Sequence, residues 1–148
     1  MGFKEISSLP KAFALGIALI LAYTIFDKIV WTFFPPAGYE KVYGMAVYSL
    51  ISFVLIPIIA IVFFEDRASI LFFYTAMLLY LGGLEDVLFY VLFLEPIPNE
   101  LPWLDGTPAS LVSNLMGFEH VTSIGLVLNS LLFFSLVMLV WFVLELKK

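Results

Sequence analysis

The chain contains no cysteine among its 148 residues. Structural disulfides, thiolate metal sites and cysteine nucleophiles are therefore excluded. Charge is also scarce, since 13% of the residues are charged and only seven are lysine or arginine, which leaves a formal net charge of −5. Because the chain has no basic patch to neutralise phosphates, we expect no nucleic-acid partner. The HExxH, P-loop and GxSxG signatures of common enzyme classes are missing as well.

Apolar residues are abundant. Hydrophobic residues make up 63% of the chain, and the mean hydropathy is +1.09. A soluble domain of this length has too little interior to bury so much apolar surface, so the expected partner is the lipid bilayer. A hydrocarbon core of about 30 Å is crossed by about 20 apolar helical residues. Four segments are long enough, and they cover residues 11–34, 42–64, 68–94 and 120–145. We therefore predict an all-α integral membrane protein, a four-transmembrane-helix bundle that forms a single domain over residues 1–148.

Proline positions refine this outline. Pro57 is expected to kink the second span, because it removes a backbone donor from the helix. The only long connection between the predicted spans, residues 95–119, holds four of the eight prolines. Within it, Thr107 as cap and Pro108 at the first helical position predict a short helix over residues 108–117, lying at the membrane interface.

The positive charges predict the orientation. On one side of the predicted bundle lie Lys4, Lys11, Arg67, Lys147 and Lys148, whereas only Lys41 lies in the opposite loops. Since cytoplasmic loops carry the excess of Lys and Arg, both termini are predicted to be cytoplasmic. The 95–119 loop then faces outward, and the cell (plasma) membrane is the expected location.

Two adjacent acids interrupt the apolar third span. Glu85 and Asp86 lie inside the stretch LLYLGGLEDVLFY, residues 78–90. A carboxylate in a bilayer costs several kcal/mol unless it faces protein, water, a cation or a ligand. Counted from the inner ends of the spans, the most polar residues of all four helices fall at about 22 to 27 Å. The other members of this predicted outer-leaflet polar layer are Asp27, Lys28, Tyr48, Ser49 and Asn129.

The third span carries small residues beside its acids. In a continuous helix, Gly82, Gly83, Asp86 and Tyr90 form one stripe. Small residues beside polar ones let membrane helices approach closely and hydrogen-bond, so Asp86 is expected to point into the bundle with this stripe.

The charges of the layer do not balance. Lys28 is its single cation, and a structural ion pair between Lys28 and one carboxylate of the third span is the simplest alternative to a functional site. Asp27, Glu85 and Asp86 outnumber that cation, however. The surplus predicts a bound cation, a bound proton or access to water.

A second polar cluster begins the fourth span. Glu119 and His120, the only histidine, are placed about 36 to 38 Å from the inner edge, so a tilt, a bend at Gly117 or an intervening substrate must bridge about 10 Å to the layer. Imidazole with carboxylates suits Zn, Fe, Ni or Mn. The candidate metal ligands are Asp27, Asp86, Glu119 and His120, and the candidate catalytic residues are Glu85, Asp86 and His120.

Three functions remain open at this point. The first is an acidic and histidine-containing pocket that binds a divalent metal ion or a small amphipathic, lipid-like ligand. In an enzyme of this kind the metal activates water or polarises the substrate, Glu119 or His120 moves a proton, and the loop acts as a lid. The second is a small non-catalytic subunit of a larger membrane complex. The third is a cation- or proton-coupled transporter that acts as a homo-oligomer, because four short helices leave little room for two gates.

Overall fold

The computed structural model describes residues 8–33, 44, 46, 47 and 49–146. Throughout this part of the chain the named elements are helical, as predicted, and an isolated antiparallel bridge joins Glu100 to Thr122. In chain order the elements are α1 (Leu9–Phe33), the π turn η1 (Ile51–Leu55), α3 (Ile56–Phe63), α4 (Asp66–Leu81), α5 (Leu84–Leu92), the 3-10 turns η2 (Pro102–Leu104) and η3 (Pro108–Ser110), α6 (Leu111–Leu115) and α7 (Ser123–Leu146).

Two helices, α1 and α7, are long and apolar enough to cross a membrane. Their bounds agree with the first and fourth predicted spans. The helices α4 and α5 count as a third span only if they are taken as one, because they are bent by 70° at the break between them. Residues 51–63 form a shorter apolar helix, and the predicted second span begins among residues outside the described part.

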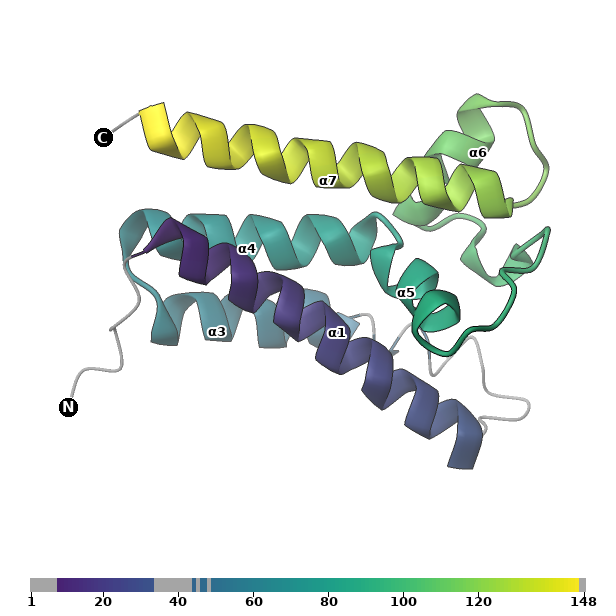
Figure 1. The fold of residues 1–148 in the computed structure, drawn as a ribbon, viewed down its shortest axis with the longest axis horizontal. Coiled ribbons are helices and arrows are strands. Elements are labelled where there is room, and N and C mark those ends of the chain that lie inside the picture. The colour runs from purple at the N-terminus through teal and green to yellow at the C-terminus, as the bar shows by residue number, and fades with distance from the viewer. Residues whose placement is uncertain (1–7, 34–43, 45, 48, 147–148) are drawn as a thin grey trace.

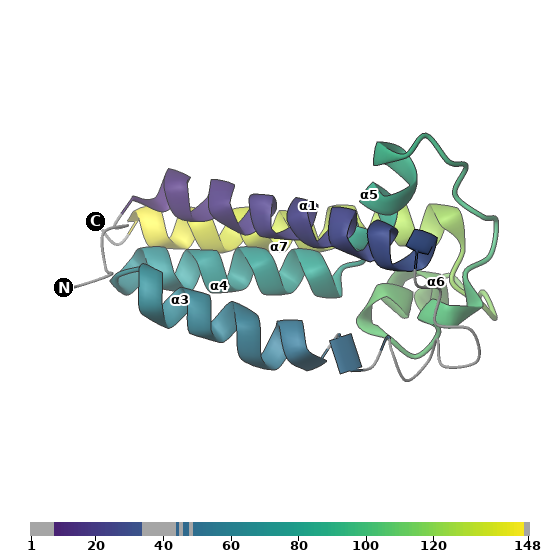
Figure 2. The ribbon, with the colours of Figure 1, turned by 90° about the horizontal axis from the view of Figure 1, so that it is seen from below.

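Helix α4 lies at the centre of the bundle. It packs against α1, α3 and α7, which run alongside it (Figures 1 and 2). The α1–α4 contact is close, since a Cβ atom on Gly16 would lie 2.7 Å from Cγ2 of Thr75. The start of α1, the α3–α4 turn and the end of α7 lie at one end, whereas α5 and α6 lie at the other.

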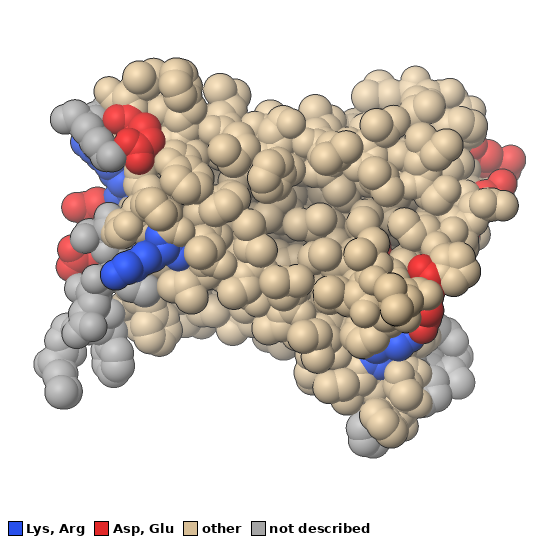
Figure 3. All heavy atoms as spheres, in the orientation of Figure 1, with Lys and Arg blue, Asp and Glu red and all other residues tan. Residues whose placement is uncertain are grey.

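On one face of the molecule, charged side chains gather at its two ends (Figure 3). On the face shown in Figure 3, Asp, Glu, Lys and Arg appear at both ends, and a broad band of other residues separates them. Large apolar side chains such as Phe26, Ile61 and Leu131 are exposed. An exterior of this kind suits contact with lipid, and is unusual for a protein that faces water on all sides.

Pro57 is accommodated by a local widening of the helix. Because proline has no N–H to donate to the carbonyl four residues earlier, the regular ladder is interrupted there. The π turn η1 immediately precedes it, and the Ile56 N–H donates to the Ile51 carbonyl. Helix α3 then continues with Pro57 in its first turn.

The third predicted span is not a continuous helix. At the break Gly83 adopts a left-handed conformation with φ of +78°, which glycine reaches without the penalty that a Cβ atom imposes. A Cβ atom there would also lie 2.5 Å from Cδ1 of Leu126. The predicted stripe is therefore wrong. Residues three or four positions apart share a face only in a continuous helix, and this helix is interrupted at Gly83. The residues affected are Gly82, Gly83, Asp86 and Tyr90.

The short helix predicted over residues 108–117 is confirmed as a helical segment, a 3-10 turn over Pro108–Ser110 followed by α6, which ends at Leu115. Pro108 lies in its first turn, and Gly117 follows its end with φ of +79°. The predicted side-chain cap is not formed, because the Thr107 hydroxyl donates to the Leu104 carbonyl at 2.6 Å instead.

Candidate functional site

The break between α4 and α5 is held in place from α7. Where a helix ends, its last carbonyls lose their partners, and in an apolar surrounding each unsatisfied carbonyl costs several kcal/mol. The Gly82 carbonyl accepts two hydrogen bonds, from Nδ2 of Asn129 at 3.0 Å and from Oγ of Ser130 at 3.1 Å. Both side chains are buried. The break is therefore stabilised by specific side-chain hydrogen bonds from α7.

Asn129 also holds the long connection over residues 95–119, which we call the outer loop after the orientation predicted for it from the positive charges. Its Nδ2 donates to the Pro108 carbonyl at 3.2 Å, and its Oδ1 accepts the Val112 N–H at 3.3 Å. One fully buried amide thus joins the break, η3 and α6. Asn129 was predicted as a polar-layer residue, and the structure engages its amide with backbone groups of the protein itself.

The break also begins a new helix that carries the two acids. Glu85 and Asp86 lie in the first turn of α5, where free N–H groups favour carboxylates. Glu85 is 8% exposed, Asp86 is half-buried, and Asp27 on α1 is 9% exposed. Asp27 lies close enough for its charge to interact with both. We call these three residues the acid cluster. Within the described part of the chain, neither Glu85 nor Asp86 forms an ion pair.

Two tyrosines border the acid cluster. The rings of Tyr23 on α1 and Tyr80 on α4 meet edge to face with centroids 5.4 Å apart. Both lie within electrostatic reach of Asp27 and Glu85. This tyrosine pair was not predicted from the sequence. A signal was present, since Tyr23 precedes Asp27 by four residues and so shares its helix face.

Lys28 lies elsewhere than expected. Its Nζ is 2.5 Å from Oε1 of Glu95, and the rings of Phe89 and Phe93 lie 4.7 and 5.2 Å from it. The expected alternative, in which Lys28 pairs with Glu85 or Asp86, is therefore wrong. The physical reason is the bend at the break, which carries the end of α5 and the residue Glu95 to the side of α1.

The single histidine closes the outer loop. Nδ1 of His120 lies 2.7 Å from Oδ2 of Asp105, and the Val121 N–H donates to Oδ1 of the same carboxylate at 2.9 Å. We call these contacts the Asp105 clasp. The hydrogen bond to Asp105 raises the pKa of His120 above its usual value. Partial desolvation raises the pKa of Asp105, but the hydrogen bonds from His120 and Val121 outweigh it and hold that pKa below its usual value.

The inner side of the outer loop packs on α5. Its apolar core, which is continued by Val87 and Tyr90 of α5, consists of Leu101, Leu104, Ala109, Val121 and Leu126. The loop therefore covers the helix that carries Glu85 and Asp86.

The predicted site residues do not form one site. Asp27, Glu85 and Asp86 come together, whereas the acids close to His120 are Asp105, Glu119 and Glu100. In the described residues no three His, Asp or Glu side chains are arranged to hold a metal ion, so the predicted ligand set Asp27, Asp86, Glu119 and His120 is not assembled.

The second span contributes little to the site that the structure describes. Ser49, predicted for the polar layer, is exposed. Tyr48, its predicted neighbour, lies outside the described residues.

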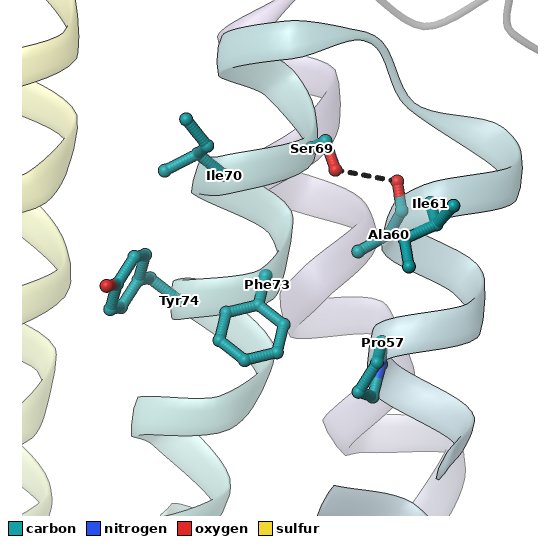
Figure 4. A pocket seen from close by; sticks show the side chains of 7 residues that line it. All are labelled: Pro57, Ala60, Ile61, Ser69, Ile70, Phe73 and Tyr74. Atoms are coloured by element: carbon teal, nitrogen blue, oxygen red, sulfur yellow. Dashed lines mark hydrogen bonds between the residues drawn. The ribbon is translucent and has the colours of Figure 1, made fainter. Parts of the chain in front are cut away.

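An apolar groove of about 270 Å³ lies between α3 and α4 (Figure 4). Its lining consists of Pro57, Ala60, Ile61, Ser69, Ile70, Phe73 and Tyr74. The Ser69 hydroxyl donates to the Ala60 carbonyl at 2.8 Å, so the one aliphatic hydroxyl in the lining of the groove has a hydrogen-bond partner. Because the groove contains no carboxylate or basic group, the acid cluster is the candidate site.

Comparisons with known proteins found no match. No protein-family model matches the sequence, and no curated protein or solved structure is significantly similar to the chain. The function is therefore proposed from the geometry of the acid cluster and its surroundings.

Proposed function

We propose that this chain is an integral membrane protein that takes up protons at the acid cluster, and acts as a proton-coupled transporter. The observation that carries the proposal is the position of Glu85 and Asp86. They start a helix at a break inside an apolar segment, and within the described residues neither has an ion-pair partner. A carboxyl group in that setting is compensated by a proton or by a bound cation.

The broken helix supports the proposal. Transporters commonly build their ion sites where a membrane helix is interrupted, since the interruption exposes backbone groups and gives the site two halves that can move. Here the interruption is stabilised by Asn129 and Ser130, and the acids follow it directly. The Tyr23–Tyr80 pair supplies hydroxyls beside the carboxylates that can pass on a proton.

The topology that we propose has four spans with both termini in the cytoplasm. Its support is that the start of α1 and the end of α7 lie at the same end, together with Lys11 and Arg67 in the first turns of α1 and α4 (Figure 1). By the positive-inside rule this end is cytoplasmic. The acid cluster then lies toward the outer face. Four spans leave little room for two gates, so we propose a homo-oligomer as the working unit.

The test is ion exchange in liposomes. Purified protein is reconstituted, a pH step is applied with and without a Na⁺ or K⁺ gradient, and internal pH is followed with a trapped dye. We expect Glu85→Gln and Asp86→Asn each to reduce the flux at least about tenfold, a loss typical of removing one proton-transfer group. Glu119→Gln is the matched control, because Glu119 is an exposed acid outside the cluster.

Wild-type protein without flux, or cluster variants that exchange ions like the wild type, would contradict a transport function. Constant copurification with another membrane protein, together with loss of assembly in the same variants, would support the non-catalytic subunit instead.

A further inference from the structure

Hydrogen bonds join the two ends of the outer loop. The Leu101 N–H donates to the Val121 carbonyl at 2.7 Å, and the Ser123 N–H donates to the Asn99 carbonyl at 3.2 Å. The Asp105 clasp closes the same two segments from the side. The turn η3 and helix α6 lie between these segments in the chain, so their position depends on whether the loop is closed.

Helix α6 is tied to the second of these segments as well. The Thr122 N–H donates to Oγ of Ser113 at 3.1 Å. A Cβ atom on Gly125 would lie 1.9 Å from the same oxygen, so α6 and α7 approach closely here. Opening of the loop is therefore transmitted to α6, and α6 bears on Asn129 through the Val112 N–H.

The other side of Asn129 bears on the acids. Its bond to Gly82 fixes a carbonyl three residues before Glu85. The Val87 N–H donates to the Gly83 carbonyl at 3.1 Å, which joins the break to the first turn of α5. Because the two acids lie in that turn, a rotation of the peptide at Gly82 moves both carboxyl groups relative to Asp27.

We propose that Asn129 is a positioning residue that couples the outer loop to the acid cluster. This inference rests on the proposed ion uptake. When the loop is closed, the side-chain amide of Asn129 is hydrogen-bonded to the Pro108 carbonyl and the Val112 N–H, and it also donates to the Gly82 carbonyl. When the loop opens, the amide is released on one side, and α5 changes its tilt at the break. Coupling between two sites is reciprocal, so occupation of the acid cluster also changes the protection of the loop.

The experiment is a double-mutant cycle on full-length protein in lipid. Asp105→Asn opens the clasp at a distance from the acids. The readout is the pH midpoint of the buried carboxyl band in infrared difference spectra, assigned with Glu85→Gln and Asp86→Asn. In a wild-type background we expect Asp105→Asn to move this midpoint by about one pH unit, a tenfold change in proton affinity and within the usual range of coupling between sites. In an Asn129→Ala background the shift should fall to less than half of that.

Ser130→Ala is the matched control. It removes the other hydrogen bond to Gly82 but leaves the bonds from Asn129 to the loop, so the shift caused by Asp105→Asn should persist. If Asn129→Ala does not fold, Asn129→Leu keeps most of the side-chain volume without the amide. A shift of equal size with and without the Asn129 amide would overturn the coupling.

No shift in the wild-type background would overturn it too. These outcomes differ from failure of the proposed function, in which the wild-type protein itself shows no carboxyl titration and no ion flux. The reciprocal measurement is hydrogen exchange at Val121, which should change between the protonated and deprotonated cluster in wild type and not in Asn129→Ala.

Discussion

The Lys28 ammonium lies 2.5 Å from the Glu95 carboxylate, although the two residues are 67 positions apart in the chain. The rings of Phe89 and Phe93 lie beside the same ammonium. This contact anchors the far end of α5 on α1, while Asn129 anchors the near end at the break. The helix that carries the two acids is thus held at both ends by residues outside it. Since Lys28 is engaged by Glu95, it does not neutralise Glu85 or Asp86.

Replacing Lys28 by Gln should lower the stability of the protein by about 1 to 2 kcal/mol. A partly exposed ion pair contributes up to about 1 kcal/mol, and contact of the ammonium with aromatic rings adds a similar amount. Thermal unfolding in detergent micelles measures the change. The reversed pair, Lys28→Glu with Glu95→Lys, should recover part of the loss. Lys11→Gln, an exposed lysine in the first turn of α1, is the control, and an equal loss there would contradict a specific role for the pair.

The positions of the long helices could be predicted from the sequence, because hydropathy depends only on local composition. Residues 11–34 and 120–145 were predicted, and the helices cover Leu9–Phe33 and Ser123–Leu146. The break in the third span could not be predicted in the same way. It depends on partners for the Gly82 carbonyl that lie 47 and 48 positions further along the chain. Two adjacent glycines marked the place, but they are equally consistent with close packing of an unbroken helix.

The acid cluster could be predicted in part. The excess of carboxylates over lysine in the apolar segments predicted that two of the three acids would lack a cation, and within the described residues Glu85 and Asp86 form no ion pair. The partners of Lys28 and His120 were missed for one common reason. Glu95 and Asp105 belong to the connection after α5, and the course of that connection depends on the 70° bend.

The outer loop should be best protected at mildly acidic pH. The pKa of Asp105 is held below its ordinary value of 3.8, so its contribution is complete above that value and is lost as the pH falls through the lowered pKa. The pKa of His120 is raised above its ordinary value of 6.5, so its contribution is complete below that value and is lost as the pH rises through the raised pKa. Both contributions are therefore complete between pH 3.8 and pH 6.5.

Hydrogen exchange at the Val121 amide measures this protection, after correction for the intrinsic pH dependence of exchange. His120→Gln should remove the decrease on the alkaline side and keep the decrease on the acidic side. Asp105→Asn should remove both. A protection profile for His120→Gln with the same alkaline decrease as wild type would rule out the histidine as its cause.

The left-handed glycine at the break should be harder to replace than a left-handed glycine that lies in open space. Gly83→Ala introduces backbone strain of about 1 to 2 kcal/mol, and crowding adds a further cost of about 1 to 3 kcal/mol. The crowding arises because the new Cβ would lie 2.5 Å from Leu126 and 3.1 Å from Cβ of Ala109. Gly106→Ala is the matched control, because Gly106 has φ of +75° with nothing within 4 Å of the added atom. Thermal unfolding should show a larger loss for Gly83→Ala, and equal losses would mean that the contact with Leu126 relaxes.

Two fully buried threonines should respond in opposite ways to the same substitution. The Thr24 hydroxyl donates to the Ile20 carbonyl at 2.9 Å, whereas the Thr75 hydroxyl has no partner among the described residues. Valine has nearly the same shape without the polar group. Thr24→Val loses a satisfied hydrogen bond and should lower the stability by about 0.5 to 1.5 kcal/mol, whereas Thr75→Val removes an unsatisfied group and should raise it by about 1 kcal/mol. Thermal unfolding of both variants gives the comparison. A loss of stability in Thr75→Val would mean that its hydroxyl binds an internal water, since a buried hydroxyl stabilises the fold only when something accepts or donates to it.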